Sequence, residues 1–333
     1  MITPDKQSII KKFEESETLF QNQNWIEALS GFQWLEENTP GTVINHNEQD
    51  INIIARFKIA KCYMELNEYD KALKQLNKLN KILKDDEDIL FDILYVLEKS
   101  GDINAASDVI EHILELKTEE DPDLMLRQAQ LSIKLNEWQK ALDILEYLSQ
   151  FYHDYLGEPL YIFLLECYRQ AGNKYDELKT IETLQKLNPL KIEYIEQRYN
   201  WHYDNYEFEK ILELTDEIFT QDEFIPSPEL ILIISKSYIA LEKISELILF
   251  LQELYNKFSS EITLLIAIAD SYKQLELYEI ALKMFTYAKL LEPDEQLNQT
   301  ITDEIEKLEI EINKDENDKI SRILYMLSID ENF

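Results

Sequence analysis

The chain has 333 residues, of which 66 are acidic and 33 basic, so its formal net charge is −33. This excess of carboxylates argues against direct contact with nucleic acid or an anionic membrane, because phosphate recognition needs clustered Lys and Arg. Hydrophobic residues make up 45% of the chain, and only 5 Gly and 8 Pro interrupt it. The composition therefore predicts a folded core and helix almost throughout.

The sequence shows neither a signal peptide, nor a membrane span, nor a disulfide framework, and these features bear on the compartment in which the protein works. The start, MITPDKQSIIKKFEES, has no apolar core of a signal peptide. The longest apolar runs are far below the roughly 18 residues needed to span a bilayer. Two cysteines, Cys62 and Cys167, imply no disulfide framework. We expect a cytoplasmic protein without a membrane span.

A repeating pattern is clearest in Ile262–Pro293, which predicts two amphipathic helices joined by a short turn. With Ile262 as position 1, small residues fall at positions 8, 20 and 27, aromatic residues at 11, 17 and 24, and a proline at 32. Applied to the whole chain, this template predicts eight helical hairpins, which start at Ile9, Ile53, Glu87, Pro122, Glu158, Ile192, Pro228 and Ile262. The starts are 34 to 36 residues apart, except for 44 between the first two.

The hairpins match the template unequally along the chain. Hairpin one has Ala28 at position 20, and the polar insertion Val43–Asn52 after it predicts a longer surface loop. Hairpins two and four fit well, and hairpin three keeps Gly101 at its turn. Hairpins five to seven have larger residues at positions 8 and 20, where the template has small residues: Glu177, Tyr199, Ile211 and Leu247. All eight prolines fall at hairpin edges or in the first turn of a helix, where proline is tolerated.

The residues after Pro293 depart from the template. Glu295–Lys314 has one apolar stripe, and a second apolar group predicts a short final helix: Ile320, Ile323, Leu324 and Leu327. Because the last hairpin of a stacked array exposes an apolar face, we expect these helices to cap it. A role in dimerisation is the alternative.

This pattern resembles the tetratricopeptide repeat (TPR), a 34-residue helix–turn–helix unit. The resemblance implies an all-α fold: a right-handed superhelical solenoid of antiparallel helix pairs with C-terminal capping helices. The repeat array would cover residues 1–295, and acidic capping helices would cover residues 296–333.

In TPR proteins the first helices of successive repeats line a concave groove that binds protein segments. The matching positions predict these groove residues: Phe13, Phe20, Phe57, Met64, Phe91, Tyr95, Leu126, Ile133, Ile162 and Tyr203. Phe13, Phe57 and Phe91 would form a contiguous aromatic patch of the kind found at interaction sites. The alternative is that these side chains pack against the neighbouring hairpin.

Groove positions toward the C-terminus are more polar, with Glu166, Arg169, Glu193, Glu196, Asn200, Asp204, Lys236, Asp270 and Lys273. They suggest an amphipathic partner whose basic residues face hairpins five and six. The acidic surface has two interpretations, solubility alone or attraction of a basic partner.

We expect no catalytic, cofactor or metal site. The histidines His46, His112, His153 and His202 lie in different hairpins or connectors, whereas a metal needs three or four converging ligands. Both cysteines fall at position 10, three hairpins apart, and neither has a His nearby for nucleophilic chemistry.

The sequence therefore predicts a non-enzymatic scaffold, adaptor or complex subunit that binds a protein segment in the groove. Two alternatives stay open: a peptide-sensing regulatory TPR protein, and an acidic mimic that competes with nucleic acid for a partner. The sequence names neither the partner nor the oligomeric state.

Overall fold

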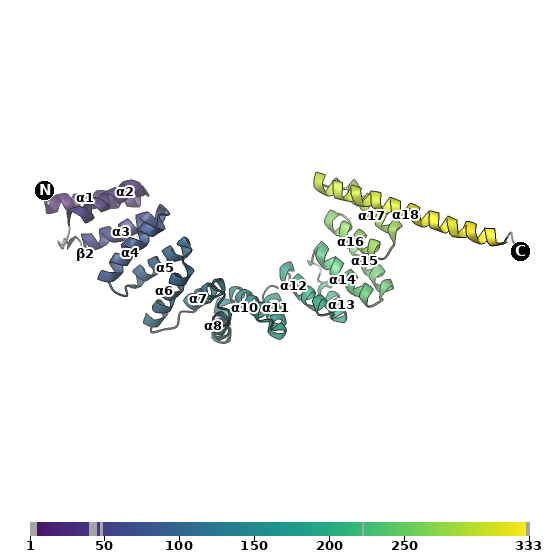
Figure 1. Cartoon of the computed structure of the whole chain (residues 1–333), viewed down its shortest axis with the longest axis horizontal. Coiled ribbons are helices and arrows are strands. Elements are labelled where there is room, and N and C mark those ends of the chain that lie inside the picture. Colours follow the sequence, from purple (N-terminus) through teal and green to yellow (C-terminus); the bar gives the residue numbers. More distant parts are fainter. Residues whose placement is uncertain (1–4, 40–44, 47–48, 222, 331–333) are drawn as a thin grey trace. The chain divides into compact units, whose positions relative to one another are not determined.

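The computed structural model describes residues 5–39, 45–46, 49–221 and 223–330, with only the backbone for residues 45, 46, 49 and 315–330. The chain divides into two compact units, an N-terminal unit (Met1–Lys174) and a C-terminal unit (Tyr175–Phe333). Each is a stack of helical hairpins (Figure 1).

The N-terminal unit contains four complete hairpins and the first helix of the fifth. The first helices of these hairpins are α1 (Lys6–Gln21), α3 (Ile51–Glu65), α5 (Glu87–Ser100), α7 (Pro122–Lys134) and α10 (Glu158–Ala171). Their second helices are α2 (Trp25–Asn38), α4 (Tyr69–Ile82), α6 (Ile103–Leu116) and α8 (Trp138–Phe151), followed by the short connector helix α9 (His153–Leu156).

The C-terminal unit begins at the second helix of hairpin five. Its helices are α11 (Lys174–Leu187), α12 (Ile192–Asp204), α13 (Phe208–Ile218), α14 (Pro228–Ala240), α15 (Ile244–Phe258), α16 (Ile262–Gln274), α17 (Tyr278–Leu290) and α18 (Glu295–Asp330). The all-helical hairpin array expected from the sequence is thus confirmed.

Capping residues explain where the helices begin. In hairpins three to eight the first helix starts at the residue that opens the sequence template. Asp86, Asp121 and Ser227 stand directly before three of these starts, and each accepts a hydrogen bond from the third backbone N–H after it. In hairpins one and two the capping residues, Asp5 and Asp50, lie farther upstream. The first two helices therefore begin before the template does.

Two short strands occupy part of the insertion expected between residues 43 and 52. Asn45–His46 (β1) pairs antiparallel with Gln49–Asp50 (β2). Ile51 and Asn52, expected in the loop, already belong to α3. Residues 43–44 and 47–48 lie outside the described residues.

The turn inside each hairpin has one fixed backbone conformation. The residue at position 15 has a positive φ in all eight hairpins: Gln23, Asn67, Gly101, Asn136, Gly172, Tyr206, Glu242 and Glu276. This left-handed conformation is easy for Gly and tolerated by Asn, and it is strained for longer side chains. A single residue per hairpin thus reverses the chain and starts the second helix.

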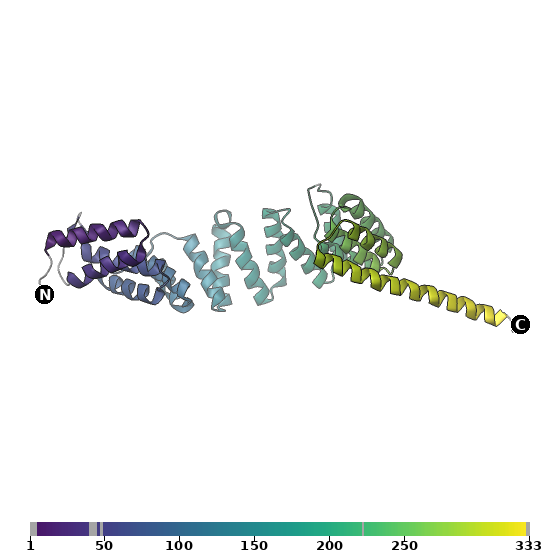
Figure 2. The same cartoon turned by 90° about the horizontal axis from the view of Figure 1, so that it is seen from above.

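Within each unit, successive hairpins stack side by side (Figures 1 and 2). In the N-terminal unit each second helix packs on the next first helix: α2 on α3, α4 on α5, α6 on α7, and α8 on α10. The template's small residues have no exposed surface where the helices approach each other: Ala28, Ala60, Ala72, Ala106, Ala129 and Ala141. Tyr199, Ile211 and Leu247, which replace small residues of the template, are buried too. Hairpins six and seven therefore accommodate larger side chains at the same positions of the repeat.

The tail forms one helix where two were expected. α18 runs without a break from Glu295 to Asp330 and continues past α17 (Figure 2). Its first half covers hairpin eight, because Ile301 and Leu308 are buried in the core of the C-terminal unit. Lys273 on α16 also bonds Glu304 at 2.6 Å. No helix in the described part of the chain is both long enough and apolar enough to cross a membrane.

If α18 caps the array, removing its buried side chains should destabilise the protein. We expect the double substitution Ile301→Ala and Leu308→Ala to lower the free energy of unfolding by several kcal/mol, since each buried Leu or Ile truncation costs about 2–5 kcal/mol. The control is Ile310→Ala on the same helix, at a side chain that is 65% exposed. Urea unfolding followed by circular dichroism measures both. Equal effects from the two variants would contradict the capping role.

Candidate protein-binding groove

The two predicted groove residues of hairpin one turn inward. Phe13 is only 7% exposed, and its ring meets Phe32 of α2 edge-on, with 6.3 Å between ring centroids. Phe20 is half-buried and packs edge-on against Trp25 at 5.1 Å and Phe32 at 6.2 Å. Phe13 is therefore buried against the second helix of its own hairpin, whereas the alternative interpretation placed it against the neighbouring hairpin. Phe13 therefore does not belong to an exposed aromatic patch with Phe57 and Phe91.

Phe57, Phe91 and Tyr95 remain accessible on the first helices α3 and α5. Phe57 and Phe91 are half-buried, and Tyr95 is 40% exposed. A lysine ammonium lies over each ring: Lys61 at 5.2 Å from Phe57, Lys117 at 5.8 Å from Phe91 and Lys99 at 5.6 Å from Tyr95. Such cation–π contacts hold aromatic rings in place while leaving part of each ring open to solvent.

The remaining predicted groove residues differ in exposure. Leu126 and Ile133 on α7 are each 8% exposed and belong to the core. Met64 on α3 is half-buried, and Ile162 on α10 is 43% exposed. Tyr203, in the C-terminal unit, is half-buried, with its ring 5.6 Å from that of Phe208. Outside hairpin one, the accessible predicted residues of the N-terminal unit are therefore Phe57, Met64, Phe91, Tyr95 and Ile162, which we call the groove set.

A ladder of ion pairs ties the first helices of the N-terminal unit together. Its rungs are Glu17–Lys58 at 3.2 Å, Lys61–Asp92 at 2.5 Å, and Glu98–Arg127, a two-bond pair whose Nε–Oε1 distance is 2.7 Å. Each rung crosses from one hairpin to the next. Because opposite charges alternate within the ladder, it contributes little net charge to this face.

Asp92 is a functional candidate that the sequence analysis missed. It stands at position 6 of hairpin three, where hairpins two and four carry the cations Lys58 and Arg127. The residue is 9% exposed, and its Oδ1 accepts the bond from Lys61. Its Oδ2 is buried with no hydrogen-bond donor among the described residues. The reversal of charge at position 6 was the signal that could have revealed it.

The polar groove residues of the C-terminal unit are partly engaged within the protein. Glu196 accepts a hydrogen bond from Ser227, the capping residue of α14. Lys273 bonds both Asp270 at 2.8 Å and Glu304 at 2.6 Å. The contacts with Ser227 and Glu304 join different helices, whereas the Asp270–Lys273 pair lies within α16. Glu196, Asp270 and Lys273 therefore have structural partners within the protein.

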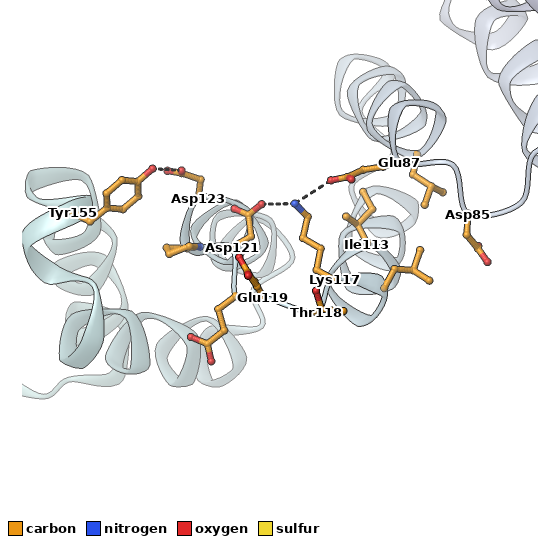
Figure 3. Close-up of a pocket in the computed structure, with 13 residues that line it drawn as sticks. Asp85, Glu87, Ile113, Lys117, Thr118, Glu119, Asp121, Asp123 and Tyr155 are labelled. Atoms are coloured by element: carbon orange, nitrogen blue, oxygen red, sulfur yellow. Dashed lines mark hydrogen bonds and ion pairs between the residues drawn. The ribbon is translucent and has the colours of Figure 1, made fainter.

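An acidic cavity of about 590 Å³ lies beside the loop between α6 and α7 (Figure 3). Its buried floor includes Leu90 and Ile113. Lys117 stands between two of its carboxylates, 2.9 Å from Asp121 and 3.0 Å from Glu87. Asp121 also caps α7 through the backbone N–H of Leu124. This part of the cavity is held together by its own ion pairs.

Tyrosines of α8, α9 and their connection engage the other carboxylates of the loop. Tyr155 donates to Asp123 at 2.6 Å, while Tyr147 and Tyr152 donate to Glu120 at 2.6 and 2.5 Å. The hydrogen bonds from the two tyrosines lower the pKa of Glu120, and the bond to Glu120 raises the pKa of Tyr152 to about 12. The tyrosines therefore fasten the loop to hairpin four.

No three His, Cys, Asp or Glu side chains of the described residues are arranged to hold a metal ion. His112 bonds Asp85 at 2.8 Å. Cys62 and Cys167 are both buried and unpaired. Burial raises the pKa of each thiol to about 11, so both stay protonated near neutral pH.

The comparisons with known proteins agree on the fold. Residues 54–120 match the family described as YpiA-like, C-terminal tetratricopeptide repeats. The C-terminal part of a TPR protein from Cytophaga hutchinsonii is similar in structure, with 15% identity, coverage of 88% of this chain and 99% of that one, and a TM-score of 0.51. The structure of Naa15/Naa10 bound to HypK-THB gives 13% identity, 91% and 57% coverage, and a TM-score of 0.51. No curated protein sequence matches significantly.

The buried thiols give a direct check on the packing around them. At pH 8, a pKa of about 11 in place of the ordinary 9.0 lowers the thiolate fraction by roughly 100-fold. We therefore expect Ellman's reagent to label the native protein at least about 100-fold more slowly than the protein unfolded in guanidinium chloride. Native labelling as fast as in denaturant would show that Cys62 or Cys167 is accessible.

Proposed function

The chain is a tetratricopeptide-repeat protein, and from that premise we propose that it is a non-enzymatic adaptor or complex subunit. Its partner is a segment of another protein, which binds on the first-helix face of the N-terminal unit. Apolar side chains of the segment contact the groove set, and the site of action is the cytoplasm.

The observation that carries this proposal is the cluster of Phe57, Lys61 and Asp92. Lys61 lies over the Phe57 ring and bonds Asp92 Oδ1, so one lysine fixes both side chains. Phe57 offers apolar surface, and Asp92 Oδ2 offers a buried acceptor without a donor. A buried acceptor left unpaired costs about 1–3 kcal/mol. A segment that brings an apolar anchor and a hydrogen-bond donor recovers that cost.

These features specify the chemistry of the partner. An amphipathic helix or extended segment docks in such a groove through apolar anchors. A basic side chain suits the donor at Asp92, since a hydrogen bond to a charged acceptor is stronger when the donor is also charged. The net charge of −33 favours approach of a basic protein over distances within the Debye length. We therefore propose a partner segment that is amphipathic and basic.

The test begins with affinity capture from native cells and identification of the partner by mass spectrometry. Titration calorimetry with the purified partner then compares variants of this chain. We expect Phe57→Ala with Phe91→Ala to weaken binding at least about tenfold, as loss of central aromatic anchors does, with helix content unchanged. The matched control, Ile26→Ala with Ile82→Ala, removes two exposed side chains from the second helices α2 and α4.

Two outcomes would contradict the proposal. Equal affinity of the wild type and the phenylalanine variant would show that the groove set is not the binding face. A complex that disappears at high ionic strength whatever the variant would show that charge alone holds it, because apolar docking survives screening by salt.

A further inference from the structure

Hairpin six departs from its neighbours at position 11. Hairpins two, five, seven and eight carry a buried tyrosine there: Tyr63, Tyr168, Tyr238 and Tyr272. Hairpin six has His202 in its place. In two cases the tyrosine hydroxyl reaches position 25 of the preceding hairpin, where Tyr63 accepts from Gln33 at 2.8 Å and Tyr168 donates to Glu146 at 3.0 Å. The tyrosine thus links consecutive hairpins.

The histidine does not make that link. The residue at position 25 of hairpin five is Glu182, and its Oε1 accepts instead from Arg198 at 2.9 Å. His202 is 3% exposed, and its Nδ1 lies 2.7 Å from Oε2 of Glu207. Because a carboxylate only accepts, Nδ1 carries the hydrogen. In the neutral imidazole Nε2 is then an acceptor. It is buried and has no partner among the described residues.

His202 forms one wall of a surface cavity of about 570 Å³ in the C-terminal unit. Four carboxylates line the same cavity: Glu182, Glu207, Glu209 and Glu213. Lys210 is a cationic lining residue and bonds Glu213 at 2.7 Å. The cavity therefore combines an excess of negative charge with an unpaired buried acceptor. This combination suits a positively charged group with several N–H donors.

Tyr206 supplies an aromatic surface to the same cavity. It occupies the turn position of hairpin six with φ of 60°, where other hairpins use Gly101, Gly172, Asn67 and Asn136. Its side chain is 79% exposed, and the ring meets Phe208 edge-on at 6.1 Å. A bulky side chain in the left-handed conformation is strained. Tyr206 at this turn therefore lowers the stability of the fold.

We propose that this cavity binds an arginine side chain of a partner protein. The planar guanidinium stacks on the Tyr206 ring, donates one N–H to His202 Nε2, and pairs with the surrounding glutamates. Arginine fits better than lysine because its five donors lie in one plane and its face stacks on aromatic rings. The site lies in the C-terminal unit and does not depend on the groove of the N-terminal unit.

The test uses the full-length protein and two matched peptides. One is acetyl-Gly-Gly-Arg-Gly-Gly-amide, and the other replaces Arg with citrulline, which has the same shape without the charge. The protein is labelled with ¹⁵N in its 4 histidines, and the His202 signals are assigned from a His202→Tyr variant. We expect the arginine peptide to shift the Nε2 resonance of His202 in a saturable way. The citrulline peptide should bind at least about tenfold more weakly, which is about 1.4 kcal/mol.

Tyr206→Asn separates the binding role of the ring from its effect on folding. Asn already occupies this turn position in hairpins two and four, so the variant should fold and have an unchanged or higher melting temperature. It should nevertheless bind the arginine peptide at least about fivefold more weakly, because the stacking surface is lost. Glu242→Asn, which places Asn at the corresponding turn position of hairpin seven, should leave binding unchanged.

Three results would overturn the proposal. These are no shift of His202 at saturating arginine peptide, equal binding of the citrulline peptide, and full binding by folded Tyr206→Asn. The variant with Phe57→Ala and Phe91→Ala should still bind the arginine peptide. The groove proposal and this one can therefore fail separately.

Discussion

One backbone constraint recurs through the whole array, the left-handed residue at the turn of each hairpin. Because position 15 has a positive φ in all eight hairpins, every second helix folds back at the same point of the repeat. In hairpins two, four and eight, buried alanines lie at the template's small positions on both helices, and in the N-terminal unit each second helix packs on the next hairpin. The stack therefore depends on contacts within each hairpin and between adjacent hairpins, as is typical of repeat proteins.

Polar contacts between hairpins turn this stack into a surface with specific chemistry. The ladder from Glu17–Lys58 to Glu98–Arg127 fixes the first helices of the N-terminal unit against one another. Lysines of the ladder and of neighbouring positions also hold the accessible aromatic rings. The same side chains therefore stabilise the stack and position the groove set. Where a rung or a link is incomplete, at Asp92 Oδ2 and His202 Nε2, a buried polar atom has no hydrogen-bond partner among the described residues.

The sequence predicted the fold well because its signals are local and repeated. Prolines marked the hairpin edges, and small residues marked the close approaches. The direction in which the groove side chains point was harder to predict from the sequence, because a residue at position 5 can face either the groove or the hairpin core. Phe13 is buried by Phe32, whereas Phe57 is not. The break expected near residues 315–319 was wrong because that segment contains no Gly or Pro to end α18. The sequence analysis considered His202 only as a metal ligand, because its position becomes informative only by comparison with the tyrosines that it replaces.

The central claim is that a partner segment lies on the first-helix face of the N-terminal unit. Site-specific photo-crosslinking in native cells tests it most directly, with benzoylphenylalanine placed at Tyr95 in the groove set or at Ile82 on α4, which are 40% and 49% exposed. We expect Tyr95 to give one protein adduct whose crosslink maps to a short amphipathic, basic segment, and Ile82 not to give it. The same adduct from both positions, or from Ile82 alone, would contradict binding on the first-helix face.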